Sequence, residues 1–178
     1  MMTAGFTEEW FGAASQDELR RLAAKIADVD GLVVEIGSWE GRSTCALANA
    51  VWPRTVHAVD TWQGSAGEIS EQLATGRDVF AQWSANIAAY TMGSVIPHRM
   101  GWREFLPLID VPVAFAFIDA EHTYAEVFDN IVGLLPLLAD GAVLCGDDQH
   151  HRPVREAVLA ALPADEVMVC ATVWSWTK

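Results

Sequence analysis

The sequence has 178 residues, of which 52% are hydrophobic and 20% charged, and its formal net charge at pH 7 is −13. This length and composition are typical of one globular domain and exclude a disordered or fibrous protein. The negative charge, without any run of Lys or Arg, argues against a nucleic-acid partner, because phosphates attract a basic surface. We therefore expect a small-molecule substrate.

The N-terminal residues carry no recognisable targeting signal. Residues 1–10 lack a basic segment followed by an apolar one, and no stretch reaches the roughly 18 apolar residues of a membrane span. Cys45, Cys145 and Cys170 lie among apolar residues without metal-ligand spacing, which indicates reduced, buried thiols. These features predict a cytoplasmic protein that does not bind membranes.

Residues 1–30 are predicted to form an N-terminal arm and one helix. We expect the aromatic side chains of the arm, residues 1–14, to pack on the domain or a partner subunit, or to form part of a lid over the substrate. These aromatic residues are Phe6, Trp10 and Phe11. A helix is predicted over residues 15–26, with Ser15 as N-cap and Glu18 three residues later.

In residues 31–178, short apolar segments alternate with amphipathic ones, the pattern of a doubly wound α/β sheet. The predicted strands cover residues 32–36, 55–59, 94–97, 113–118, 141–145, 166–170 and 172–176. The predicted helices cover residues 43–51, 68–90 (as one or two helices), 103–109, 124–138 and 152–162. The sequence contains no repeat and no linker, so residues 1–178 are expected to form a single domain.

The stretch from Val33 to Thr44, VVEIGSWEGRST, joins the first predicted strand to its helix. Gly37 and Gly41 allow the backbone to approach a ligand closely, and the first helical turn, with Ser43 and Thr44, offers free amides at the carboxyl end of the strand. Trp39 stands where a dinucleotide-binding loop would carry glycine. The stretch predicts a nucleotide-like ligand that lacks a pyrophosphate.

Asp60 ends the second predicted strand, about 20 residues after the glycine loop. An acid in that position can accept hydrogen bonds from both hydroxyls of a ribose. Together with the glycine loop, Asp60 indicates an adenosine-containing cofactor other than NAD.

Three carboxylates follow the fourth and fifth predicted strands, namely Asp119, Asp147 and Asp148. The carboxyl ends of adjacent parallel strands face one crevice, where these groups would repel one another unless they are protonated or neutralised by a cation. Oxygen ligands suit Mg²⁺ or Mn²⁺. The other interpretation is that Asp119 contacts the cofactor while Asp147 and Asp148 cap the next helix.

Four segments resemble, in order, the motifs of class I S-adenosylmethionine-dependent methyltransferases: EIGSWEGRST, VDTW at residues 59–62, FIDAEHTY at residues 117–124 and LLADGAVLCGDD at residues 137–148. The chain is most similar to the metal-dependent O-methyltransferases of the macrolide-sugar and cephalosporin-pathway group, over residues 32–176. This resemblance implies a Rossmann-like methyltransferase fold, with a mostly parallel seven-stranded sheet and an antiparallel C-terminal strand.

The resemblance also implies a role for each matching position. The residues expected at the methionine part of the cofactor are Glu35, Gly37, Ser38 and Gly41. Asp60 would hold the ribose, and Trp62 would flank the adenine together with the turn at Gly101 and Trp102.

In the resembling family, the positions of Asp119, Asp147 and Asp148 ligate the metal. His122 matches the position of the general base, and an imidazole suits this task because its ordinary pKa lies near the working pH. Asp119 and His122 are therefore the expected catalytic residues. His150 and His151 are open to several roles: a further metal ligand, an alternative base, a substrate contact or simply a polar loop.

These inferences predict an O-methyltransferase that uses S-adenosylmethionine and a divalent metal to methylate a small molecule such as a sugar or a phenol. The long connection over residues 61–93 is expected to act as a lid. Because little of the chain lies outside the core, we also expect a homo-oligomer. Two alternatives are an inactive cofactor-binding protein, and a metal-dependent hydrolase or oxygenase built on Asp147, Asp148, His150 and His151.

Overall fold

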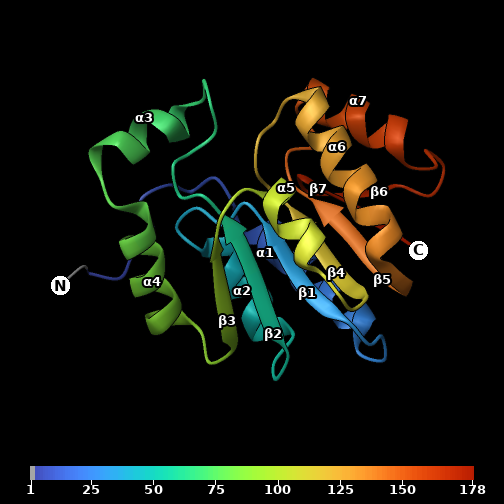
Figure 1. Ribbon diagram of the computed structural model, residues 1–178, viewed down its shortest axis with the longest axis horizontal. Helices are drawn as coiled ribbons and strands as arrows, with labels where there is room; N and C mark the ends of the chain where they lie inside the picture. The colour runs from blue at the N-terminus through green and yellow to red at the C-terminus, as the bar shows by residue number, and fades with distance from the viewer. Residues whose placement is uncertain (1–2) are drawn as a thin grey trace.

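The computed structural model describes residues 3–178. Within these residues one seven-stranded sheet has the order β3-β2-β1-β4-β5-β7-β6 (Figure 1). The strands are β1 (Leu32–Ile36), β2 (Thr55–Asp60), β3 (Ser94–Arg99), β4 (Val113–Ile118), β5 (Leu138–Gly146), β6 (Met168–Cys170) and β7 (Val173–Thr177). The pairs from β3 across to β5 are parallel, and β7 runs antiparallel to both of its neighbours. The predicted fold class is confirmed.

Helices cover both faces of the sheet. The α-helices are α1 (Ala13–Ala23), α2 (Arg42–Ala50), α3 (Ile69–Gly76), α4 (Val79–Tyr90), α5 (Trp102–Phe105), α6 (Tyr124–Leu134) and α7 (Arg152–Ala161). Helices α5, α6 and α7 cover one face, in front of the sheet in Figure 1, and α1 and α2 cover the other. Among residues 3–178, none of these helices is long and apolar enough to cross a membrane.

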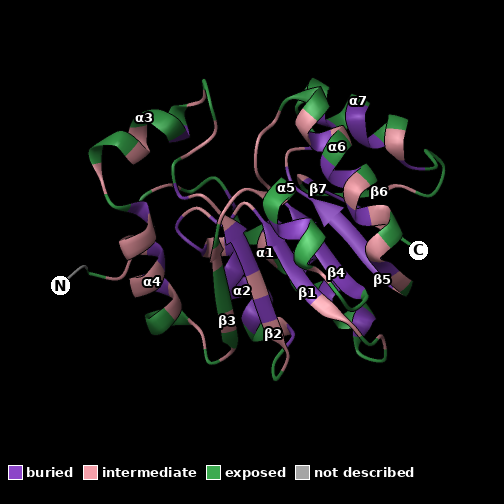
Figure 2. Cartoon of the chain, viewed as in Figure 1, coloured by how far each residue is buried: buried purple, intermediate pink, exposed green. Residues whose placement is uncertain are grey.

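The apolar core is centred on β4, whose sequence VAFAFI is buried at every position (Figure 2). Successive side chains of a strand point to opposite faces. Ala116 and Ile118 therefore pack under α6 and α7, whereas Phe115 and Phe117 pack under α1 and α2. A strand buried on both faces and paired on both edges fixes where its carboxyl end lies, and the candidate site begins at that end.

The start of α1 differs from the prediction. The helix begins at Ala13 with Gly12 as N-cap, so Ser15 is not the cap. Ser15 is buried, and its Oγ lies 2.9 Å from the Oγ1 atom of Thr172. Glu18 pairs with Arg21 at 2.6 Å instead of closing a capping box. The hydroxyl of Ser15 thus makes a tertiary contact with the C-terminal hairpin, whereas the local sequence pattern predicted that it would cap the helix.

Other boundaries shift for local reasons. The segment predicted as residues 124–138 becomes α6 and a 3-10 turn at Leu135–Leu137, because Pro136 lies where the α-helix ends. The connection over residues 68–90 holds two helices, α3 and α4. The turn between β6 and β7 is made by Ala171 with a positive φ of 53°. Cys170 beside it is exposed, so the expectation of three buried thiols was wrong for this cysteine.

Gly146 allows β5 to lie close to its neighbours just before the two aspartates. A Cβ atom at this position would lie 2.5 Å from the carbonyl oxygen of Ile118 and 2.6 Å from the indole of Trp174. We predict that Gly146→Ala lowers the free energy of unfolding by about 1–3 kcal/mol, because it overpacks this junction.

Urea unfolding followed by circular dichroism measures the effect of Gly146→Ala. Gly76→Ala is the matched control, since a Cβ atom there meets nothing within 4 Å among the described residues. The control is expected to change stability by no more than about 1 kcal/mol. Equal unfolding midpoints for wild type and Gly146→Ala would contradict the packing argument.

Candidate active site at the carboxyl edge of the sheet

A cavity of about 960 Å³ opens at the carboxyl ends of β1, β2, β4 and β5. Among the predicted site residues, those that line it are Gly37, Asp60, Gly101, Trp102, Asp119, His122, Asp147 and Asp148. Trp10, Trp39, Glu68, His150 and His151 line it as well. The glycine loop, the acid after β2 and the three-carboxylate cluster thus meet around one space. Its volume is at the upper end of the range for small-molecule sites.

The glycine loop lies against the end of β4. Gly37 has a φ of +87°, and a Cβ atom on it would lie 2.0 Å from the carbonyl oxygen of Asp119. Asp60 organises the same loop, because its Oδ2 atom accepts hydrogen bonds from the amides of Ser38 at 2.7 Å and Trp39 at 2.8 Å. Its Oδ1 atom accepts from the amide of Trp62 at 2.6 Å. Asp60 therefore shapes the loop in addition to facing the cavity.

Glu35 lies beneath the loop, fully buried, and does not line the cavity described here. Its Oε2 atom accepts hydrogen bonds from the hydroxyls of Ser38 and Thr44, and Oε1 has no partner among the described residues. Burial raises the pKa of Glu35 to about 7, although these hydroxyls act to lower it. The side chains of Glu35, Ser38 and Thr44 thus hold the loop together from below.

Five further residues predicted to contact the cofactor are not among those lining the cavity: Ser38, Gly41, Ser43, Thr44 and Trp62. Gly41 is the N-cap of α2, and a Cβ atom on it would lie 2.9 Å from Cδ1 of Trp83. The indole of Trp62 is 3% exposed and packs edge-on against Phe80 and Trp83. Its Nε1 atom donates to the carbonyl of Trp39. Trp62 therefore supports the loop from the core, where the sequence suggested a place beside the adenine.

Asp119, Asp147 and Asp148 converge as predicted. Each offers a carboxylate oxygen, and these oxygens all lie within 4.8 Å of one another. Burial and the neighbouring carboxylates raise the pKa of Asp119 and of Asp147. Burial also raises the pKa of Asp148, but the nearby imidazoles, above all that of His122, together outweigh burial and hold this pKa below its ordinary value. The cluster concentrates negative charge that a cation would neutralise.

The alternative role for Asp147 and Asp148, as helix caps, does not fit the geometry. The N-cap of α7 is His151, without a side-chain capping bond, and Asp147 instead accepts a hydrogen bond from the hydroxyl of Thr172. Asp148 has a left-handed backbone with a φ of 60°, which turns its carboxylate toward His122. Both side chains belong to the cavity.

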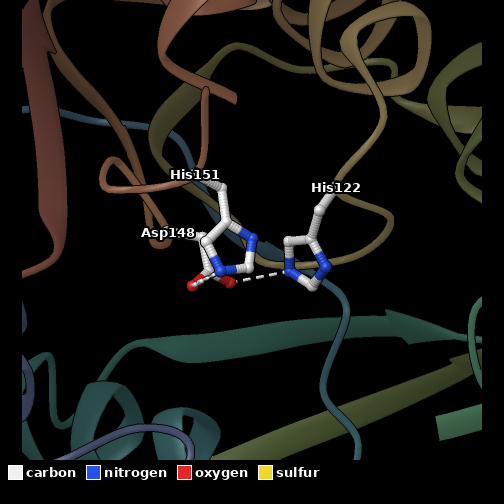
Figure 3. Close-up of side chains that lie close together, drawn as sticks. All are labelled: His122, Asp148 and His151. Carbon is white, nitrogen blue, oxygen red and sulfur yellow. Dashed lines mark ion pairs between the residues drawn. The ribbon is translucent and has the colours of Figure 1, made fainter. Parts of the chain in front are cut away.

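His122 lies between two carboxylates from different parts of the chain. Its Nδ1 atom is 3.1 Å from both carboxylate oxygens of Glu68. On the other side of the ring, Nε2 is 2.7 Å from Oδ2 of Asp148, as Figure 3 shows. Burial lowers the pKa of His122, but the carboxylates of Asp119 and Asp148 raise it to about 11. Without a cation on these aspartates the imidazole is protonated, so its use as a base requires that they be neutralised.

The sequence pattern missed Glu68 as a site residue, and it placed the N-terminal arm near the substrate only as one of two alternatives. Glu68 precedes α3, and its pattern showed only a polar helix start. The arm is held by Glu8, which accepts hydrogen bonds from Trp39 Nε1 at 3.1 Å and Arg77 Nη2 at 2.8 Å. Trp10 then lines the cavity, with its ring 5.6 Å from that of Trp39. Only the aromatic content of the arm hinted at this role.

The strand order, the glycine loop after β1 and the acid after β2 define a class I S-adenosylmethionine-dependent methyltransferase. Residues 34–149, more than half of the chain, match the family described as "Methyltransferase domain". The chain therefore belongs to that family. No curated protein matches the sequence.

Solved structures share the fold. The O-methyltransferase NovP is 23% identical, with a TM-score of 0.68 over 94% of this chain and 80% of that one. CalS11, a TDP-rhamnose 3'-O-methyltransferase of calicheamicin biosynthesis, is 15% identical, with a TM-score of 0.61 over 94% and 81%. An O-methyltransferase from Bacillus cereus in complex with SAH is 18% identical, with a TM-score of 0.58 over 94% and 82%. At these identities the similarity establishes the fold.

The raised pKa of Glu35 makes stability depend on pH. In the unfolded chain this carboxyl ionises near pH 4.5, whereas in the ligand-free folded protein it keeps its proton up to about pH 7. Between these values the unfolded state binds fewer protons, so stability falls as the pH rises. This decline is about 3 kcal/mol for Glu35 alone.

We predict that Glu35→Gln removes this part of the decline, because the amide does not ionise. Urea unfolding at several pH values between 4.5 and 7.5 measures the difference between variant and wild type. Glu9→Gln, at an exposed position, should follow the wild-type profile. A constant difference between wild type and Glu35→Gln across this range would show that Glu35 ionises normally in the folded state.

Proposed function

We propose that the protein transfers the methyl group of S-adenosylmethionine to a hydroxyl oxygen of a small molecule, with a divalent cation bound by Asp119, Asp147 and Asp148. The observation that carries the proposal is the convergence of these carboxylates and His122 on the cavity that also holds the glycine loop and Asp60. A protein that only bound the cofactor would have no need of this cluster.

The cavity fits the proposed cofactor. Asp60, Gly37, Gly101 and Trp102 all line the cavity. In the proposal, Asp60 would take the ribose, the turn at Gly101 and Trp102 the adenine, and Gly37 would contact the methionine end. When bound, S-adenosylmethionine supplies an electrophilic methyl group. Its role here is also supported by the B. cereus structure, which contains SAH. The volume of about 960 Å³ leaves room for an acceptor beside the cofactor.

The carboxylate cluster fits a hard cation, Mg²⁺ or Mn²⁺. The ligand oxygens lie within 4.8 Å of one another, and the raised pKa of Asp119 and Asp147 reflects their burial and the repulsion of neighbouring carboxylates, which the nearby imidazoles offset only in part. When bound, such a cation would stabilise negative charge on an acceptor oxygen. It would also oppose the upward shift in the pKa of His122, because it would neutralise the two carboxylates that cause this shift.

His122 would accept the proton of the acceptor hydroxyl at Nε2, the nitrogen that faces the aspartates. Glu68 contacts the opposite nitrogen, Nδ1, and so fixes the ring orientation and the tautomer. We assign Glu68 as a positioning residue contributed by the connection over residues 61–93, which extends the earlier expectation that this segment covers the substrate.

The acceptor is proposed to be a sugar or a phenol. NovP, CalS11 and the B. cereus protein are O-methyltransferases, and CalS11 acts on TDP-rhamnose. In this chain Trp10 and Trp39 provide flat apolar surface beside the polar cluster, which suits a ring that carries hydroxyl groups. Assembly into a homo-oligomer stays a prediction.

The proposal predicts cofactor binding and metal-dependent turnover. Calorimetry should detect binding of S-adenosylhomocysteine to the protein. In the presence of Mg²⁺, the protein should transfer the radiolabelled methyl group of S-adenosylmethionine to at least one compound in a panel of sugars and phenols. EDTA should abolish transfer, and Asp147→Asn should reduce it by about 100-fold or more.

Asp140→Asn is the matched control for Asp147→Asn, because it changes an exposed aspartate near the opposite end of β5 and should retain activity. Folded protein that binds no S-adenosylhomocysteine would refute the proposal. Methyl transfer by the wild type that is equally fast with and without EDTA would refute the proposed metal dependence.

The assignment of His122 as base predicts a selective loss of turnover. His122→Gln should lower kcat by about 10² to 10⁴-fold without weakening S-adenosylhomocysteine binding. Glu68→Gln should cause a smaller loss and move the pH profile of kcat, because the ring nitrogen loses a charged partner.

Glu71→Gln controls for the Glu68 substitution, since it changes an acid on α3 that contacts the amide of Gly67 instead. A Glu68→Gln enzyme with the wild-type kcat and pH profile would leave Glu68 only a structural role.

A further inference from the structure

The site contains a second set of metal-binding groups besides the three aspartates. His122 comes from the loop after β4, and Asp148 and His151 from the loop after β5 (Figure 3). One atom from each lies within 4.8 Å of the other two. The Nε2 atom of His122 is 2.7 Å from Oδ2 of Asp148, and Nε2 of His151 is 4.0 Å from Oδ1 of the same carboxylate.

We propose that His122, Asp148 and His151 form a binding site for a borderline transition-metal ion such as Zn²⁺, and that an ion bound there inhibits the enzyme. The inhibitory part rests on the proposed methyltransferase function. The binding part stands on the side-chain arrangement alone.

The donor atoms support this selectivity. Two imidazole nitrogens with one carboxylate oxygen suit Zn²⁺ or Co²⁺, whereas the all-oxygen cluster of Asp119, Asp147 and Asp148 suits Mg²⁺. Ligand atoms around a tetrahedral Zn²⁺ lie about 3.4 Å apart, given metal–ligand distances of about 2.0–2.2 Å. The two spacings, 2.7 Å from His122 to Oδ2 and 4.0 Å from His151 to Oδ1 of Asp148, lie on either side of this value. Small side-chain rotations would therefore bring both nitrogens and one carboxylate oxygen into position around one ion.

The surroundings of His122 provide a second, independent observation. A metal-bound histidine usually donates a hydrogen bond from its other ring N–H to a carboxylate or another acceptor. Glu68 lies 3.1 Å from Nδ1 of His122, which leaves Nε2 for the site. This Nε2 atom is shielded from solvent and, for all its closeness to Asp148, has no aligned hydrogen-bond partner among residues 3–178. The ring is therefore held in the orientation that a metal ligand requires.

Inhibition is expected because two residues of the proposed zinc site, His122 and Asp148, also have roles in the proposed reaction. An ion on Nε2 of His122 would occupy the lone pair that the proposed reaction needs for the acceptor proton. The same ion would engage Asp148, which also belongs to the carboxylate cluster. A transition metal would thus compete both with the proton and with Mg²⁺.

The test uses the full-length protein without an affinity tag. Titration with Co²⁺ should produce the visible absorption of a tetrahedral site, and calorimetry should show Zn²⁺ binding in the presence of excess Mg²⁺. His151→Ala and Glu68→Gln should each weaken Zn²⁺ binding by about 10 to 100-fold. His150→Ala is the matched control and should retain the affinity within about 3-fold. Although Nε2 of His150 lies 3.7 Å from Oδ1 of Asp148, His150 does not belong to the group whose ligand atoms all lie within 4.8 Å of one another.

Absence of the Co²⁺ absorption, or equal Zn²⁺ affinity in wild type and His151→Ala, would overturn the site. An equal loss in His150→Ala and His151→Ala would also overturn it. In the activity assay, micromolar Zn²⁺ should inhibit Mg²⁺-supported transfer by the wild type and inhibit His151→Ala only at higher concentration. If methyl transfer were never observed, the Co²⁺ and Zn²⁺ titrations would still decide the metal site, so the two proposals fail separately.

Discussion

Three like charges within 4.8 Å of one another, at the carboxyl edge of a buried sheet, are the constraint on which the site depends. Aspartates so close together are stable only when something positive, or a proton, lies among them. The protein supplies His122, which binds a proton tightly between Asp119 and Asp148. This proton lies beside the carboxylates that would bind the cation of the proposed methyl transfer. The imidazole therefore compensates the charge of the resting site, and the proposed role as a base would require another cation to take over that task.

A second buried acid, Glu35, lies under the glycine loop, and its surroundings stabilise it in a different way. Among residues 3–178 Glu35 has no cationic partner. Its carboxyl group accepts hydrogen bonds from the hydroxyls of Ser38 and Thr44 and keeps its proton up to about pH 7. Asp60, at the end of the adjacent strand, lines the cavity and accepts hydrogen bonds from backbone amides of the loop. One acid thus supports the loop from below while the other shapes its exposed side.

Much of this arrangement could be read from the sequence because it depends on where strands end. Apolar runs identified β1, β2, β4 and β5, and parallel strands in one sheet bring their final residues to one edge, so Asp60, Asp119 and Asp147 had to meet. Contacts set by tertiary packing could not be read in this way. Ser15 bonds to Thr172 across 157 positions, and Glu68 reaches His122 across 54. No local pattern encodes such partners, and Trp62 looked like a ligand contact although its indole packs in the core.

The N-terminal arm shows how so short a chain completes a cavity. Arg77, from the junction between α3 and α4, bonds to Glu8 of the arm and lies 3.1 Å from Glu40 of the glycine loop. Glu40 is almost fully buried and also accepts the amide of Thr7 at 2.7 Å. Three segments that are distant in sequence are therefore joined by charged groups largely removed from water, where such contacts are strong and where the loss of one partner is costly. Because Trp10 follows Glu8 by two residues, the same network also holds Trp10 at the cavity. The arm and the glycine loop are thus fixed to each other as two walls of one cavity.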